Sequence, residues 1–260
     1  MLHHAQIINK NKELQNRGFF SGKNSIFQKN DYFCKKKLTM EKYAIGIDIG
    51  GTNTDIGLVR NDGKVVSRFN LSTSAYSDVN LYINDMISRI NTLMQNAGIK
   101  FIDGVGIDAP NANYYNGCIE ANTANFTIKE QIPLKKLMEQ GLHVPVVVSN
   151  DANAAAYGEL VYGAAKGMKH FIMFTLGTGV GSGIVVDGRL VHGSTGTAGE
   201  LGHSILIPDG RLCSCGRHGC IEMYASARGI CQTCLELLKE EKDYTGILAQ
   251  YTKETLTSKI

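Results

Sequence analysis

One histidine and three cysteines lie close together in the chain and could bind a metal ion. His203 is followed by Cys213, Cys215 and Cys220. Zn²⁺ prefers four tetrahedral nitrogen and sulfur ligands, and the Cys-X-Cys and Cys-X4-Cys spacings allow a short loop to place three sulfurs around one ion. Four protein ligands leave no position for a catalytic water, so the sequence predicts a structural zinc site. The alternative is a reduced cysteine-rich loop in which His203 makes only a local hydrogen bond.

Two glutamates flank this cluster and could bind a ligand with vicinal hydroxyls. Glu200 lies three residues before His203, and Glu222 lies two residues after Cys220. Carboxylates accept hydrogen bonds from sugar hydroxyls, and a metal-bound histidine can offer its other ring nitrogen to a ligand. For either glutamate taken alone, the alternative is a solvated surface charge.

Two glycine-rich turns predict binding of phosphate. In a tight turn between strands, the absence of side chains lets backbone N–H groups approach an anion, and a threonine adds a hydroxyl donor. Asp48, at the end of the first strand, could hold Mg²⁺ through water. The alternative is a glycine hairpin with a structural aspartate. The candidate phosphate-binding residues are Asp48, Gly50, Gly51, Thr52 and Asn53 in the first turn and Gly177, Thr178 and Gly179 in the second.

A further carboxylate stands where a strand is expected to meet a helix. Asn150 and Asp151 precede an alanine-rich segment. An aspartate in this position can take the proton of a substrate hydroxyl as that hydroxyl attacks a phosphoryl group, the general-base role of kinase chemistry. The alternative is a helix N-cap, for which both residue types are preferred. The two roles are compatible.

The hydrophobic pattern predicts an α/β chain with a repeated strand–turn–strand unit. We expect strands at residues 43–49, 56–60, 64–71, 104–107, 144–149, 171–176 and 181–186. We expect helices at residues 79–96, 131–140, 152–162 and 226–239. The repeat suggests two similar lobes that face each other across a cleft, each contributing one glycine turn. The predicted organisation is a leader at residues 1–39, an N-terminal lobe at 40–148 and a C-terminal lobe with the zinc loop at 149–260.

The composition excludes several classes of protein. The 260 residues are 43% hydrophobic and 20% charged, and they include no apolar run near the ~20 residues that a membrane helix requires. The net charge of +3 gives little reason to expect a nucleic-acid partner. Seven cysteines without a secretory signal fit a reducing compartment, so we expect a cytoplasmic protein. Residues 1–39 read as an unfolded leader or an upstream mis-start before Met40.

Together these motifs resemble the ROK family of sugar kinases and related repressors. The motifs are DIGGTN at 48–53, NDANAA at 150–155, LGTGVGSG at 176–183, ELGH at 200–203 and CSCGRHGCIE at 213–222. The resemblance implies an actin-like ATPase fold with two ribonuclease-H-like lobes. It also implies ATP-dependent phosphorylation of a hexose, with ATP, Mg²⁺ and a structural Zn²⁺.

The resemblance also implies a role for each matched residue. Asp151 would be the catalytic base, and the glycine turns would hold the phosphates of ATP. The sugar ligands would be Asn111, Asn125, Asn150, Asp151, Glu200, His203 and Glu222. The zinc ligands would be His203, Cys213, Cys215 and Cys220. Asn111 stands where the family more usually has glycine.

Two alternatives to an active kinase remain open. Family members continue past the zinc loop to a late Gly-Gly motif that cradles the adenosine, whereas this sequence stops at Ile260. We therefore expect an incomplete second lobe, and one alternative is a non-catalytic fragment that retains zinc and sugar binding. The other is a sugar-sensing regulator, although residues 1–39 are too few for a winged helix-turn-helix. The resemblance allows a homodimer and several hexoses or amino sugars as substrate.

Overall fold

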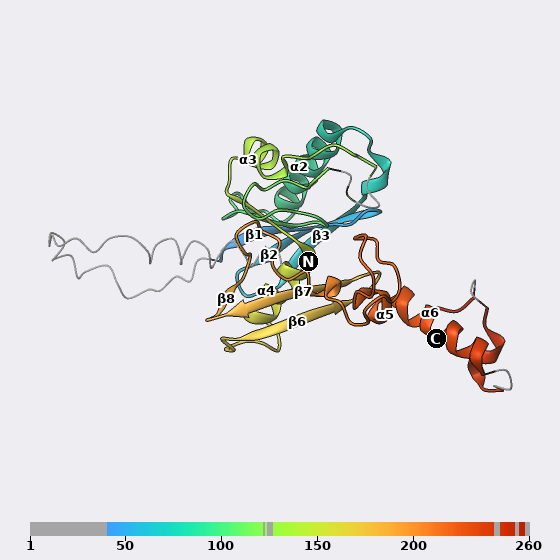
Figure 1. Cartoon of the computed structure of the whole chain (residues 1–260). Coiled ribbons are helices and arrows are strands. Elements are labelled where there is room, and N and C mark those ends of the chain that lie inside the picture. The colour runs from blue at the N-terminus through green and yellow to red at the C-terminus, as the bar shows by residue number, and fades with distance from the viewer. Residues whose placement is uncertain (1–40, 122, 124–126, 242–244, 253–254, 258–260) are drawn as a thin grey trace. The chain divides into compact units, whose positions relative to one another are not determined.

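The computed structural model describes residues 41–121, 123, 127–241, 245–252 and 255–257, and it divides into two compact units (Figure 1). The units are Met1–Lys166 and Gly167–Ile260. The sequence analysis placed the boundary between lobes after residue 148, before the helix α4 (Asp151–Val161), whereas the first unit includes this helix. At the end of α4, the hydroxyl of Tyr162 donates a hydrogen bond of 2.9 Å to the carbonyl of Asn61. The expected leader at 1–39 lies outside the described residues.

The first unit is built on a five-stranded sheet with the order β3-β2-β1-β4-β5. Its strands are β1 (Tyr43–Ile49), β2 (Asn53–Arg60), β3 (Val65–Ser72), β4 (Val105–Asp108) and β5 (Val146–Ser149). The first three strands are antiparallel, and β4 and β5 run parallel to β1. Asp48 of β1 lies opposite Asp108 of β4, which lies opposite Ser149 of β5. The carboxyl ends of three strands therefore meet at one edge, the edge at which open α/β sheets bind ligands.

Helices α2 (Val79–Asn96) and α3 (Leu134–Leu142) pack with this sheet, and the 3-10 turn η1 (Thr73–Ala75) follows β3. Helix α2 begins after Asp78, whose carboxylate accepts hydrogen bonds from the N–H groups of Asn80 and Leu81, as a good N-cap does. Its core-facing side chains recur at helical spacing. These buried residues are Val79, Tyr82, Ile83, Met86, Ile90 and Leu93.

Helix α3 begins three residues later than the sequence analysis predicted. Ile132 pairs with Ile119 in an isolated antiparallel bridge, and its N–H and carbonyl are used there. Pro133 follows as the residue before the first helical turn. Helix formation is therefore delayed to Leu134 because the preceding backbone is already paired.

The second unit contains a three-stranded antiparallel sheet with the order β6-β7-β8. The elements are β6 (Phe171–Leu176), β7 (Val180–Val186), β8 (Arg189–Leu190), η2 (Leu201–His203), α5 (Glu222–Ala225), α6 (Ala227–Glu240) and η3 (Ile247–Gln250). Ser226 caps α6 by accepting from the N–H of Gly229. Three alternate side chains of β6, Ile172, Phe174 and Leu176, are exposed.

The predicted repeat is confirmed at the level of the strands. In each unit a strand, a short glycine turn and an antiparallel second strand follow one another. In the first unit, the N–H of Gly50 donates a hydrogen bond of 2.8 Å to the carbonyl of Asn53 and closes the turn. In the second unit, the N–H of Gly177 donates a hydrogen bond of 3.0 Å to the carbonyl of Gly179. Within the described part of the chain, every helix is too short or too polar to cross a membrane.

A buried hydroxyl network supports the first glycine turn and gives a test of the fold. Tyr82 is fully buried, and its hydroxyl lies 2.5 Å from Thr54 Oγ1, which lies 2.7 Å from Thr73 Oγ1. Tyr82→Phe removes one member and leaves a buried hydroxyl short of a partner. We expect the free energy of unfolding to fall by about 1–2 kcal/mol, measured by urea denaturation. Tyr115→Phe, at an exposed ring, is the control and should change it by less than about 0.5 kcal/mol.

The same network predicts a difference in alkaline stability. Burial raises the pKa of Tyr82 to about 12, so its neutral form stabilises the folded state fully below the ordinary tyrosine pKa of about 10. This contribution should be lost as the pH rises from about 10 through about 12, and Tyr82→Phe should lack that loss. Parallel pH profiles of the two proteins over this interval would contradict the assigned environment.

Candidate functional site

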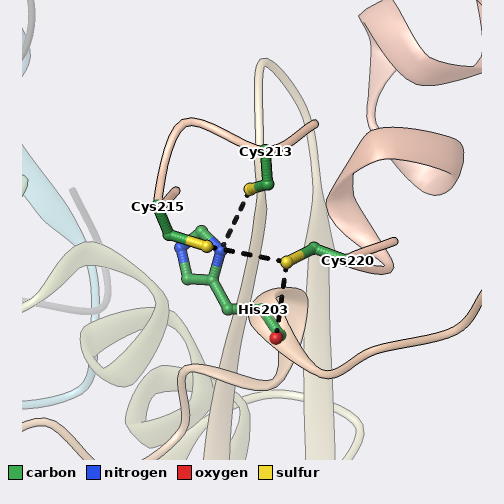
Figure 2. A group of neighbouring side chains, drawn as sticks. All are labelled: His203, Cys213, Cys215 and Cys220. Carbon is green, nitrogen blue, oxygen red and sulfur yellow. Dashed lines mark hydrogen bonds between the residues drawn. The ribbon is translucent and has the colours of Figure 1, made fainter. Parts of the chain in front are cut away.

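The second unit brings together the four residues that the sequence predicts as metal ligands. His203 Nδ1 and the sulfur atoms of Cys213, Cys215 and Cys220 all lie within 4.8 Å of one another. Figure 2 shows the imidazole and the three sulfurs converging on a common point. Cys213 and Cys220 are buried, and Cys215 is exposed. The loop therefore forms a compact cluster of donors with one side open to solvent.

The distances within the cluster fit a tetrahedral ion. With Zn–S near 2.3 Å and Zn–N near 2.0–2.1 Å, tetrahedral geometry requires sulfur atoms about 3.8 Å apart and a sulfur–nitrogen distance of about 3.6 Å. Cys215 and Cys220 have their sulfurs 3.6 Å apart, and Cys213 Sγ lies 3.5 Å from His203 Nδ1. The residues present therefore fit a four-ligand metal site.

The surroundings give the cysteine thiols different acidities. The backbone N–H and the guanidinium of Arg217 lower the pKa of Cys215 to about 6, because both donate to the thiolate. Burial raises the pKa of Cys220 to about 11, because the charged form loses water, and the neighbouring thiols add to this effect. Cys215 is therefore a thiolate at neutral pH, the form in which a cysteine binds metal.

The segment Glu200–His203 rests directly on strand β7. A side chain at Gly202 would collide with the carbonyl oxygen of Val180, so only glycine permits this approach. Ser182 of β7 donates to the carbonyl of Gly199 and accepts from the N–H of Leu201. The position of His203 is thus set from both sides, by β7 and by the loop that carries the three cysteines. Glu200 itself is exposed.

Glu222 connects the metal loop to the second glycine turn. Its Oε2 accepts a hydrogen bond of 3.0 Å from the N–H of Val180. A Cβ at Gly179 would lie 2.5 Å from the same oxygen, so a side chain there would have to displace the Glu222 carboxylate. The carbonyl of Gly177 accepts from the N–H of Ala227 at the start of α6. The second unit therefore places Glu200, His203, Glu222 and the turn at 177–179 around the beginning of β7.

In the first unit, Asn150 and Asp151 lie where β5 meets α4. Asn150 is the N-cap of α4, and its Oδ1 accepts from the N–H groups of Ala152 and Asn153. Asp151 is the first helical residue, is exposed, and accepts from the N–H of Ala152 at 2.8 Å. The carboxylate of Asp151 therefore bonds the first turn of its own helix and is also exposed at the carboxyl edge of β5.

The first glycine turn lies at the same edge of the sheet. Thr52 and Asn53 are exposed, and Asp48 is half-buried at the end of β1. Sequence reasoning missed the neighbouring Asp108, which is buried and pairs with Asp48 across β1 and β4. Paired residues in adjacent strands share one face of a sheet. The repeated triplets Gly-Ile-Asp at 46–48 and 106–108 were the signal that could have found it.

The remaining predicted sugar contacts follow β4. Asn111 has a φ of 57° and is exposed, and its side-chain amide donates to Thr123 Oγ1 at 3.4 Å. A left-handed residue is most often glycine, and asparagine is among the best substitutes, which explains how Asn111 occupies a position where glycine is more usual. Asn125 lies outside the described residues.

Comparisons with known proteins agree on one family. The model of the ROK family matches residues 44–257. A glucokinase from Halalkalibacterium halodurans is 35% identical over 228 residues, covering 84% of this chain and 67% of that enzyme. A glucokinase from Streptomyces coelicolor is 40% identical over 190 residues, covering 72% of this chain and 57% of that enzyme. A xylose repressor from Bacillus spizizenii is 32% identical over 213 residues, covering 79% of this chain and 53% of that protein.

A solved structure supports the same assignment. The ROK family glucokinase from Streptomyces griseus, crystallised with glucose and AMPPNP, aligns with a TM-score of 0.63 and 33% identity, covering 84% of this chain and 69% of that one. The chain thus has the α/β fold of actin-like sugar kinases. It spans about three fifths to two thirds of the length of the two related glucokinases. Matched over most of its length by the family model and by relatives with 35–40% identity, the chain belongs to the ROK family.

Proposed function

We propose that the protein is a cytoplasmic ATP:hexose phosphotransferase of glucokinase type. The observation that carries the proposal is the exposed carboxylate of Asp151 at the start of α4, beside the N-cap Asn150 and at the carboxyl edge of the parallel strands. The related glucokinases and the relative bound to glucose and AMPPNP support the same reaction.

In the proposed reaction, Asp151 acts as general base. A sugar hydroxyl attacks the γ-phosphorus of ATP, a new oxygen–phosphorus bond forms, and the bond to the leaving ADP oxygen breaks. The hydroxyl proton passes to the carboxylate of Asp151. Most of the remaining catalysis in phosphoryl transfer comes from positioning and from stabilisation of charge.

The sugar would be held by groups whose orientation is already fixed. Asn150 uses its Oδ1 to cap α4, so its amide N–H groups are available as donors. Glu222 holds Val180 with one oxygen and can accept a sugar hydroxyl with the other. The other proposed sugar ligands are Asn111, Asn125, Glu200 and His203.

The two glycine turns would bind the phosphates of ATP. Exposed N–H groups and the hydroxyls of Thr52 and Thr178 are suitable donors to phosphate oxygens. Asp48, with Asp108 beside it, would hold Mg²⁺, which neutralises charge that develops on the transferred group. Zn²⁺ on His203, Cys213, Cys215 and Cys220 would stabilise the loop that leads to Glu222, the first residue of α5.

Sugar sensing without catalysis is a second candidate function. The 32% identity to a xylose repressor motivates it, because the family combines kinases with regulators. Sequence-specific binding of operator DNA in a gel-shift assay would favour this function. Sugar binding by calorimetry without nucleotide binding would favour the non-catalytic alternative.

Replacing the proposed base gives the direct test of kinase chemistry. Asp151→Asn keeps the size of the side chain and removes its ability to accept a proton. We expect turnover with ATP and glucose in a coupled assay to fall by about 10²–10⁴-fold. Sugar affinity, measured by calorimetry, should change far less.

Asp187→Asn is the matched control for this substitution. Asp187 lies in the turn between β7 and β8 with a φ of 51°, a conformation that asparagine tolerates well, and its side chain is 79% exposed. Its turnover should equal that of the unaltered protein. Equal turnover by the Asp151 variant would refute the assigned base.

The proposed metal site predicts about one zinc per chain in purified protein. Because the metal binds the folded loop, it should stabilise the fold by about 2.7 kcal/mol when free zinc is 100-fold above its Kd. Cys215→Ser should lower the bound zinc well below one equivalent and abolish the loss of thermal stability on chelation. Elemental analysis and thermal unfolding with and without a chelator are the measurements.

Cys234→Ser is the control, because this half-buried cysteine of α6 lies outside the cluster. It should retain full zinc content and the response to chelator. A wild-type protein without stoichiometric metal would exclude the site.

A further inference from the structure

Arg211 stands at the stem of the metal loop, which we define as residues Arg211–Cys220. Its carbonyl accepts a hydrogen bond of 2.9 Å from the N–H of Gly219, the residue before the ligand Cys220. Two residues further along, the N–H of Cys213 bonds the carbonyl of Arg217 at 2.8 Å, and Leu212 pairs with His218. The backbone of Arg211 is therefore connected to both sides of the loop that carries the three cysteines.

The guanidinium of Arg211 leaves the loop and reaches across α5 to α6. One terminal nitrogen donates to the carbonyls of Met223 at 2.7 Å and Gly229 at 3.1 Å. The other donates to Thr233 Oγ1 at 2.9 Å and to Glu236 Oε2 at 2.5 Å. These four acceptors extend from α5 to the third turn of α6, so one side chain connects the loop with two helices.

The environment of this guanidinium is that of a buried structural contact. Its side chain is only 12% exposed, and its central carbon lies 4.6 Å from the ring centroid of Tyr224. The hydroxyl of Tyr224 in turn accepts from the N–H of Arg211 at 2.9 Å. Arginine suits this position because its planar fork presents five donors in fixed directions, whereas lysine offers one compact ammonium group.

Helix α6 buries only part of its apolar surface. Ile230 and Leu237 are exposed, Leu235 and Leu238 are half-buried, and Gly229 is the only fully buried residue of the helix. A short helix with little buried apolar surface depends on tertiary contacts for its stability. The contacts of Arg211 with Thr233 and Glu236 are tertiary contacts of this kind, and they begin in the metal loop.

We propose that Arg211 is a positioning residue that couples metal binding to the order of α6. The inference rests on the proposed metal site. The guanidinium fixes the stem of the loop in the conformation that brings the cysteines together, and the metal-bound loop holds the guanidinium against α6. Because such coupling is reciprocal, loss of the arginine weakens metal binding and loss of the metal loosens the helix.

The test measures zinc affinity and hydrogen exchange on the full chain. In the unaltered protein, chelation should raise amide exchange in α6 as well as in the metal loop. Arg211→Met should weaken zinc binding by about 10–100-fold in a chelator competition, the range typical of groups that support metal ligands. It should also make α6 exchange rapidly whether or not zinc is bound.

Arg211→Lys keeps the positive charge and removes the planar guanidinium. Its zinc affinity and its exchange in α6 should resemble those of Arg211→Met, because one ammonium group cannot reach four acceptors. Arg228→Met is the matched control. Arg228 lies on α6 itself, where its guanidinium approaches Met223 Sδ at 3.9 Å. Its loss should leave zinc affinity and the response of α6 to chelation unchanged. If the Arg211 variants do not fold, Thr233→Val removes one acceptor, and it should weaken zinc binding several-fold.

The outcomes distinguish this inference from the metal site itself. Wild-type protein that binds no zinc overturns the metal site, and the role of Arg211 with it. Wild-type protein that binds zinc, together with an Arg211→Met or Thr233→Val variant of equal affinity and unchanged α6 response, overturns the coupling alone. Wild-type behaviour of Arg211→Lys overturns the requirement for the guanidinium fork.

Discussion

Convergence of three sulfurs and one imidazole nitrogen within 4.8 Å is the constraint on which the second unit depends. Loop backbone costs free energy to order, and this stretch offers few apolar side chains to compensate, since Ile205, Leu206 and Leu212 are exposed. A metal ion bound by these four ligands would supply the missing stabilisation at one point. Hydrogen bonds connect this region to β7 through Glu222 and to α6 through Arg211.

In the first unit, the candidate site residues are positioned by a packed sheet. Its parallel strands β1, β4 and β5 are buried by apolar residues, and their ends align in register. Asp48, Asp108 and the Asn150–Asp151 pair are therefore placed by the core of a sheet. Polar groups at the ends of these strands are held by the packed sheet. The polar groups of the second unit are held instead by hydrogen bonds between loops and strands.

Local patterns predicted most of the fold, and tertiary contacts account for the rest. Helix α2 has the predicted bounds because its apolar spacing and the Asp78 cap are both local signals. The start of α3 was wrong because the bridge between Ile132 and Ile119 competes with the helix for backbone. The metal cluster was predictable from spacing, since three of its four ligands share one loop.

Other parts of the candidate site were beyond sequence reasoning. Oε2 of Glu222 accepts a hydrogen bond from the N–H of Val180, which lies 42 residues earlier in the chain. A local sequence pattern does not predict a contact over this separation. The burial of Asp108 beside Asp48 follows from strand order, which a single sequence does not state. The bond between Glu222 and the glycine turn also limits how the two segments can change in evolution. A methyl group at position 179 would displace the Glu222 carboxylate, and a shorter acid at 222 would not reach the N–H of Val180, so a substitution in either segment alters its contact with the other.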